Sequence, residues 1–274
     1  MIKMCNNKFD SLTSWRYEGI QVQNKSLYQA PYPQRKNVTS YNKKKRHPPF
    51  CKHTSYGIIL CGKVNGEIKY ALIKKRLSYG VTYILRGDWK DEYFYELSYA
   101  ERDMFIHICL LQENWEHTLM HLWIEWKSDI NNIYDYCNCR DNFIKHRHWL
   151  LHKLQTCTSI FPYGVWEFPK GHREKYDVSP QQCALRELQE ETGIDKRYVQ
   201  LLNIGMLEEI YRNWTSNYYV GFVNEALCQD IQLKGEASQL VWLSFHDALQ
   251  LIPNVFSDRK GILTYVHELL SYLL

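Results

Sequence analysis

EFPKGHREKYDVSPQQCALRELQEETGI, residues 167–194, is the stretch that decides the interpretation of the chain. It combines a Pro-Lys-Gly turn, a polar loop and a segment with helix signals at both ends. Ser179 supplies a hydroxyl N-cap and Pro180 suits the first helical turn. Gly193 stands where a helix would end in a left-handed residue. The sequence therefore predicts a helix near residues 180–192.

Three glutamates share one side of this predicted helix. Glu187, Glu190 and Glu191 are neighbours on its surface, because positions i, i+3 and i+4 lie on one face. Like charges this close destabilise a helix unless a cation neutralises them. Mg²⁺ and Mn²⁺ prefer carboxylate oxygens and retain positions for a phosphorylated substrate, and Arg186 can pair with one carboxylate. The pattern predicts a divalent-metal site; the alternative is a charged helix that faces solvent.

The same residues resemble a known family signature. Gly171, followed by Arg186-Glu187-Leu188-Gln189-Glu190-Glu191-Thr192-Gly193-Ile194, is similar to the Nudix box of enzymes that hydrolyse a nucleoside diphosphate linked to another group. The resemblance implies an α/β (α+β) fold, an α-β-α sandwich with a mixed sheet. It also implies that Glu187, Glu190, Glu191 and the Gly171 carbonyl bind metal. Glu190 or Glu191 would in addition activate a metal-bound water.

The loop before the helix departs from the family signature. It holds 14 residues between Gly171 and Arg186, one more than the signature has. A one-residue insertion is the simplest account. In the family a loop glutamate orients the arginine, and Asp177 or Glu174 is expected to replace it here. Asp177 and Arg186 are thus assigned to structural support.

A second match lies downstream, in Glu236-Ala-Ser-Gln-Leu-Val-Trp242. In several family members a glutamate six residues before a tryptophan reaches the metal as a ligand or general base. The resemblance therefore implies a catalytic and metal-binding role for Glu236, the alternative being an exposed loop glutamate. Glu208 and Glu209 are further candidates for the same role.

Hydrophobic patterns outline the rest of the chain. Asn65-Gly66 separates two short apolar runs, which predicts a β-hairpin with strands near 55–63 and 69–76. Residues 88–160 show helical spacing, and a capping-box signature stands at Ser98-x-x-Glu101. Strand-like runs and a final amphipathic helix follow. This order predicts a mixed sheet flanked by helices and interrupted by a helical insertion.

Charge is distributed unevenly along the 274 residues. Residues 1–50 carry ten Lys or Arg and two acidic residues, whereas the remainder carries 24 basic and 28 acidic residues. A basic, partly extended N-terminal segment at 1–53 is therefore expected before a hydrolase domain at 54–274. Its charge favours attraction to a polyanion, and a solvated tail is the alternative.

The turn residues narrow the expected substrate. WEFPKG, in place of a Pro-Gly-Gly form, resembles the mRNA-decapping branch of the Nudix family, especially the proteins of large cytoplasmic DNA viruses. In those proteins a comparable helical insertion accompanies RNA binding. The resemblance implies capped mRNA as substrate, release of 7-methyl-GDP and 5′-monophosphate RNA, Mg²⁺ or Mn²⁺ as cofactor, and host shutoff in the host cytoplasm or a place in the virion. The alternatives are a hydrolase of diphosphoinositol polyphosphates, of free nucleotides or of nucleoside diphosphates linked to another group, and a non-catalytic RNA-binding protein.

Basic residues in three places are assigned to substrate or RNA binding, because single-stranded RNA needs a positively charged groove. They are Lys170 in the turn, Lys74, Lys75 and Arg76 at the end of the second strand, and Lys145, Arg147 and Lys153 in the insertion. The alternative is an insertion that serves as a structural cap with a solvated basic face. The insertion's tryptophans are more often core anchors than base-stacking residues.

The nine cysteines are scattered and odd in number, and the start MIKMCNNKFD lacks the apolar core of a signal peptide. Reduced thiols are therefore expected. A zinc site from Cys137 and Cys139 with Cys51 and His53 is the alternative, although no C-x-x-C pair supports it. No apolar run approaches the roughly 20 residues that span a bilayer, so no membrane partner is expected.

Overall fold

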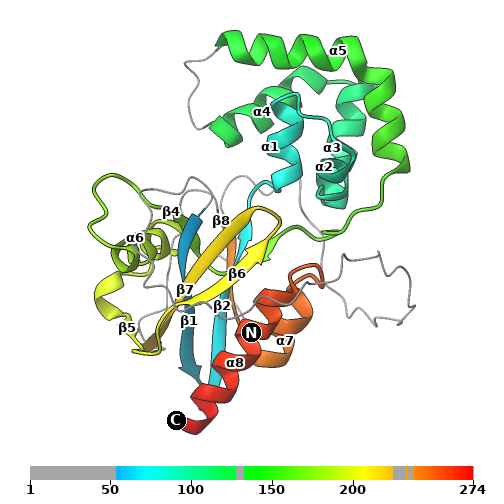
Figure 1. Ribbon diagram of the computed structural model, residues 1–274. Helices are drawn as coiled ribbons and strands as arrows, with labels where there is room; N and C mark the ends of the chain where they lie inside the picture. Colours follow the sequence, from blue (N-terminus) through cyan, green and yellow to red (C-terminus); the bar gives the residue numbers. More distant parts are fainter. Residues whose placement is uncertain (1–53, 128–132, 225–232, 234–236, 274) are drawn as a thin grey trace, which may run out of the picture. The chain divides into compact units, whose positions relative to one another are not determined.

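The computed structural model describes residues 54–127, 133–224, 233 and 237–273 (Figure 1). All of them belong to one compact unit, Pro48–Leu274. The basic segment predicted at 1–53 and the candidate Glu236 lie outside the described residues. The described part is a mixed sheet with helices on both faces and a helical insertion, which confirms the predicted fold class.

A β-hairpin begins the sheet. β1 (Thr54–Val64) and β2 (Glu67–Lys75) pair antiparallel up to the turn at Asn65 and Gly66. The φ angles of these two turn residues are 52° and 85°, a left-handed conformation that asparagine and glycine adopt readily. The hairpin predicted from the Asn-Gly pair is confirmed.

β1 lies at the centre of the sheet, with β7 (Trp214–Asn224) parallel beside it and β2 antiparallel on its other side. The strand order is β3-β2-β1-β7-β5, while β4 pairs with β1, β6 with β7 and β8 with β2. The remaining elements outside the insertion are β3 (Trp166–Glu167), β4 (Lys170–His172), α6 (Pro180–Thr192), η2 (Lys196–Tyr198), β5 (Gln200–Leu201), β6 (Leu207–Tyr211), β8 (Ala237–Leu243), α7 (Phe245–Leu251) and α8 (Ser257–Leu273).

Successive residues of β1 face opposite layers of the fold. Ile58 and Leu60 pack in the cluster that contains α6 residues, whereas Ile59 and Cys61 pack in the cluster formed with α7 and α8. All four are fully buried, as expected for a central strand covered on both faces. Figure 1 shows α6 on one side of the sheet and α7 and α8 on the other.

The insertion lies between β2 and β3 and has a hydrophobic core of its own. Its helices are α1 (Tyr79–Leu85), α2 (Asp91–Tyr95), α3 (Tyr99–Cys109), α4 (Trp115–Lys127) and α5 (Ile133–Thr156). The helices thus begin at Tyr79, earlier than the expected residue 88. Trp123 is buried in this core, whereas Trp149 is 43% exposed. No helix in the described ranges is long and apolar enough to cross a bilayer.

Glu101 joins the first and third helices of the insertion. Its buried carboxylate accepts hydrogen bonds from the Ser98 N–H at 2.7 Å and from the Ser78 N–H at 2.6 Å. The Ser98 hydroxyl accepts in return from the Glu101 N–H at 3.3 Å, which completes the predicted capping box of α3. Ser78 is itself the N-cap of α1, so one carboxylate anchors two helix starts.

We expect Glu101→Ala to destabilise the insertion. The substitution leaves two buried N–H donors without their acceptor, which should lower the free energy of unfolding by about 2–4 kcal/mol. Urea denaturation followed by the helical circular dichroism signal measures this change. Asp103→Ala, at an exposed position of the same helix, is the matched control. Equal loss of stability in the two variants would contradict the anchoring role of Glu101.

Candidate active site

α6 begins and ends at the residues that the sequence indicated. The Ser179 hydroxyl accepts from the Gln182 N–H at 3.1 Å, and Pro180 occupies the first turn. Gly193 ends the helix with φ 75°. Glu187, Glu190 and Glu191 therefore all lie on α6, within the bounds that the sequence predicted.

The backbone of Gly171 packs directly against the Glu187 carboxylate. A Cβ atom at position 171 would overlap the carboxylate carbon and both of its oxygens. The Gly171 carbonyl lies 3.9 Å from the Cys183 Sγ, so this oxygen also faces α6. Only glycine permits this contact between β4 and α6.

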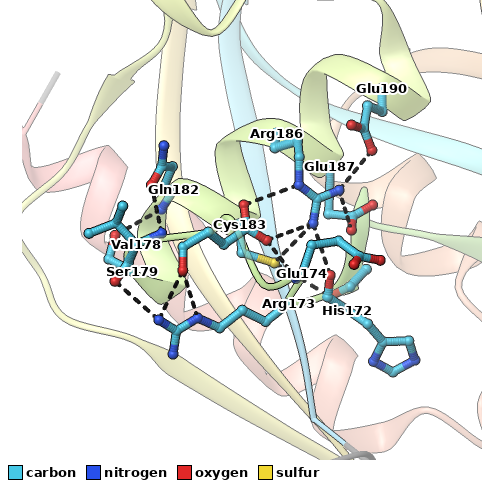
Figure 2. A network of polar contacts seen from close by, with 12 residues as sticks. His172, Arg173, Glu174, Val178, Ser179, Gln182, Cys183, Arg186, Glu187 and Glu190 are labelled. Carbon is cyan, nitrogen blue, oxygen red and sulfur yellow. Dashed lines mark hydrogen bonds and ion pairs between the residues drawn. The ribbon is translucent and has the colours of Figure 1, made fainter. Parts of the chain in front are cut away.

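Arg186 is the centre of the polar network shown in Figure 2. Its Nε and Nη2 donate to the two carboxylate oxygens of Asp177 at 3.1 and 2.9 Å, and Nη2 also donates to the His172 carbonyl at 2.9 Å. Its Nη1 lies 2.8 Å from Glu187 Oε1 and 2.8 Å from Glu190 Oε2. One guanidinium thus ties the loop to two glutamates of the helix.

Asp177, rather than Glu174, contacts Arg186 in the lengthened loop. Asp177 is 4% exposed, and the hydrogen bonds from Arg186 hold its pKa below the usual range. Glu174 is exposed and contributes its N–H, which donates to Asp177 Oδ2 at 2.8 Å. Arg173 closes the loop by donating to the Asp177 carbonyl.

Glu191 lies apart from the Arg186 network. Its side chain is buried, and Oε2 accepts from the Lys170 N–H at 2.8 Å. Burial raises the pKa of the Glu191 carboxyl to about 8, although Lys75 and Lys170 nearby favour its charged form. A carboxyl with such a pKa can hold or release a proton near neutral pH.

The three glutamates do not converge on one point. Glu187 and Glu190 share Arg186 as their partner, whereas Glu191 faces the turn. Within the described ranges, no three His, Cys, Asp or Glu side chains gather as a metal centre requires. The donor chemistry nevertheless fits Mg²⁺ or Mn²⁺, since the carboxylates share one helix and Gly171 presents its carbonyl.

Two of the basic candidates are engaged by a buried carboxylate. Lys170 Nζ lies 2.7 Å from Glu167 Oε2, and Lys75 Nζ lies 3.5 Å from Glu167 Oε1. The two lysine side chains are only 9% and 14% exposed. Both lysines therefore have an intramolecular partner and little exposed surface, and their assignment to substrate binding stays a prediction.

The other basic candidates are distributed over two regions. Lys74 is half-buried beside Trp166, and burial lowers its pKa, while Arg76 is exposed. In α5, Lys145 is exposed, Arg147 is half-buried, and Lys153 pairs with Asp91 at 2.7 Å. Lys145 thus supplies exposed positive charge on α5, and Arg86, Lys90 and Lys127 of the insertion are exposed as well.

The remaining acidic candidates differ in access. Glu208 is exposed on β6, whereas Glu209 is 2% exposed and its Oε1 lies 2.9 Å from Arg259 Nη2. Glu209 is thus bound inside the fold. The cysteines of the suggested zinc site, Cys137 and Cys139, lie in α5 as free thiols, and their suggested partners Cys51 and His53 are outside the described residues.

Three residues that surround the Lys170 side chain and β3 were not predicted from the sequence. Glu167, Tyr79 and Arg259 come from β3, α1 and α8, and they meet only in the folded chain. A signal was present, because Arg259 interrupts the apolar stripe of the last helix and is 3% exposed.

Comparisons with known proteins agree with this site. The sequence profile of the NUDIX domain matches residues 144–265. The chain is 34% identical over 109 residues to the asymmetrical bis(5′-nucleosyl)-tetraphosphatase of Sus scrofa, covering 38% of this chain and 71% of that protein. It is 27% identical over 191 residues to mRNA-decapping protein g5R of African swine fever virus, and the match covers 65% of this chain and 75% of that protein.

A third relative is an Acanthamoeba polyphaga mimivirus protein provisionally named as an mRNA-decapping protein. It is 32% identical over 118 residues, which make up 40% of this chain and 33% of the mimivirus protein. The chain therefore spans about a third of that relative. The crystal structure of a Caenorhabditis elegans Ap4A hydrolase complex aligns with 79% of this chain and 98% of its own, at 14% identity and a TM-score of 0.44, too low to assign a function.

The chain belongs to the Nudix family. β1 and β2 precede the matched residues, yet they occupy the middle of the same sheet. The family generally uses divalent metal ions.

We expect Gly171→Ala to slow hydrolysis strongly without unfolding the chain. The added Cβ must displace the Glu187 carboxylate, and a displacement of about 1 Å can lower a rate about 100-fold. Steady-state assays with a phosphoanhydride substrate, together with thermal melts, measure both effects.

Gly261→Ala is the matched control for this variant. A Cβ at Gly261, in α8, would meet nothing within 4 Å. The control should therefore keep the parent activity and match or exceed its stability. Full activity in Gly171→Ala would show that the close contact is dispensable.

Proposed function

We propose that this Nudix hydrolase removes the 5′ cap of mRNA and releases 7-methyl-GDP and 5′-monophosphate RNA. The observation that carries the proposal is a Nudix box joined to a large helical insertion in a chain similar to a viral decapping protein over 191 residues. That similarity extends beyond the residues that match the NUDIX profile. If capped mRNA is the substrate, the enzyme would act in the host cytoplasm.

The insertion supports a polymeric substrate. Connections of this length in a compact domain usually have a function of their own. α5 presents Lys145, Arg147 and His148 with partial or full exposure, and Trp149 is 43% exposed beside them. Positive charge with an accessible aromatic ring suits the phosphates and bases of single-stranded RNA.

The proposed roles of the site residues follow from their positions. Glu187, Glu190, Glu191 and the Gly171 carbonyl would hold Mg²⁺ or Mn²⁺, with Glu236 as a further ligand from the downstream segment. The bound ion would neutralise phosphate charge and lower the pKa of a water ligand. Arg186 and Asp177 keep the loop against the helix, and Glu190 or Glu191 takes the proton of the attacking water.

The reaction is a hydrolysis that needs no other reactant. The water oxygen bonds to one phosphorus of the anhydride nearest the RNA, and the bridging oxygen leaves with the other phosphorus. The proton accepted by the glutamate returns to solvent. Two phosphates remain on the 7-methylguanosine and one on the RNA.

A second candidate function is hydrolysis of a dinucleoside tetraphosphate. The Sus scrofa relative, at 34% identity over 71% of its length, carries that activity in its name. The names of these relatives give no support to diphosphoinositol polyphosphates. A non-catalytic RNA-binding protein would not need the glutamates of the box.

Decapping is tested with cap-labelled RNA and Mg²⁺ or Mn²⁺. The parent protein should release labelled 7-methyl-GDP, and Glu190→Gln and Glu191→Gln should each lower the rate by about 100-fold or more, because a positioned acid or base contributes at least that much. Glu268→Gln, at an exposed position of α8, should match the parent. Cleavage of diadenosine tetraphosphate alone would favour the second function, and full activity in both box variants would exclude catalysis by the box.

RNA capture by α5 gives a separate prediction. Lys145→Ala combined with Arg147→Ala should weaken RNA binding and reduce the slope of log affinity against log salt by about 1.4, the value for two phosphate contacts to a single strand. Turnover of a short capped dinucleotide should hardly change. Fluorescence anisotropy at several salt concentrations measures the slope.

Lys63→Ala is the control for the α5 variant. Lys63 is an exposed lysine near the β1–β2 turn, in the sheet and outside the insertion. Its removal should leave the salt slope close to the parent value. Equal slopes for the α5 variant and the parent would place RNA binding elsewhere on the chain.

A further inference from the structure

A buried ionic network lies behind the Pro-Lys-Gly turn. Its carboxylates are Glu167 and Glu209, which are 0% and 2% exposed, and its cations are Lys75, Lys170 and Arg259. Buried ion pairs seldom improve stability over well-packed apolar side chains. The network therefore needs another explanation, and its position next to the active site suggests one.

Arg259 is held rigidly at one end of this network. It comes from the first turns of α8, and its Nε and Nη2 lie 3.2 and 2.9 Å from the two oxygens of Glu209. The Tyr218 hydroxyl donates to Glu209 Oε2 at 2.7 Å, and the Phe256 ring lies 4.1 Å from the guanidinium carbon. These contacts fix the plane of the guanidinium.

The other side of Arg259 contacts β3. Its Nη1 donates to the Trp166 carbonyl at 3.0 Å, and its Nη2 lies 3.8 Å from Glu167 Oε2. β3 is two residues long and pairs with β2 at Ile73 and Lys74. Arg259 therefore anchors a short strand whose next residues form the turn.

Glu167 connects Arg259 with the turn. Its Oε2 accepts from Lys170 Nζ at 2.7 Å and from the Tyr79 hydroxyl at 3.3 Å. The Pro169 carbonyl accepts from the Ile58 N–H at 3.0 Å, which fixes the turn to β1. The Lys170 N–H then donates to Glu191 Oε2 at 2.8 Å. A continuous series of contacts thus joins α8 to Glu191.

We propose that Arg259 is a positioning residue for the hydrolase. Arg259 holds Trp166 and Glu167, and this fixes the position of the Lys170 N–H. The N–H in turn orients the Glu191 carboxylate for binding a divalent ion. The inference rests on the proposed role of Glu191 as a metal ligand. Partners that orient metal ligands typically change metal affinity 10–100-fold when they are lost.

Two variants of the full chain test the role. Arg259→Met removes every polar contact, and Arg259→Lys keeps the charge but not the fork geometry. Each folded variant should bind Mn²⁺ at least about tenfold more weakly than the parent in calorimetry without substrate. The kcat should fall while KM changes little, and amide exchange of residues 166–171 should accelerate. Unchanged Mn²⁺ affinity and exchange would overturn the proposal.

Controls separate positioning from stability. Glu209→Gln with Arg259→Met removes one charge of each sign and should recover thermal stability while Mn²⁺ binding stays weak. Glu101→Ala, destabilised in the insertion, should bind Mn²⁺ as the parent does. Recovery of Mn²⁺ affinity together with stability in the double variant would reduce Arg259 to a structural role.

Failure of the inference on Arg259 can be distinguished from failure of the proposed function. If the parent cleaves neither capped RNA nor diadenosine tetraphosphate, the proposed function fails, while Mn²⁺ binding and amide exchange still test Arg259. If Glu191→Gln binds Mn²⁺ as tightly as the parent, Glu191 is not a ligand and the inference on Arg259 is wrong.

Discussion

The contact between the Gly171 backbone and the Glu187 carboxylate is the constraint on which the site depends. No side chain fits between them, so the turn and the box helix meet at one distance. Arg186 then closes the loop by contacting Asp177, His172 and two glutamates. The extra loop residue is accommodated because Asp177 still reaches the guanidinium with both of its oxygens.

The sheet supports this contact from both sides. β1 carries the turn through its pairing with β4, and its alternating side chains fill two separate cores. The insertion has a third core of its own, so its exposed surface can differ without altering the packing of the sheet.

The basic side chains beside β3 differ in exposure from those of α5 in the insertion. Lys75 and Lys170, which looked like substrate contacts in the sequence, pair with Glu167 inside the fold. α5 instead exposes its basic side chains in part or in full. A lysine in a sequence does not reveal which of these roles it has, because the deciding carboxylate comes from a different element.

Local signals determined much of this protein. The box helix, the Asn65-Gly66 turn and the capping box at Ser98 follow from neighbours in sequence, whose caps and φ preferences act over a few residues. Tertiary structure alone decided the partners of Lys170 and Arg259, and it separated Glu191 from Glu187 and Glu190. Burial and ion pairing join residues far apart in the chain, so no local pattern records them.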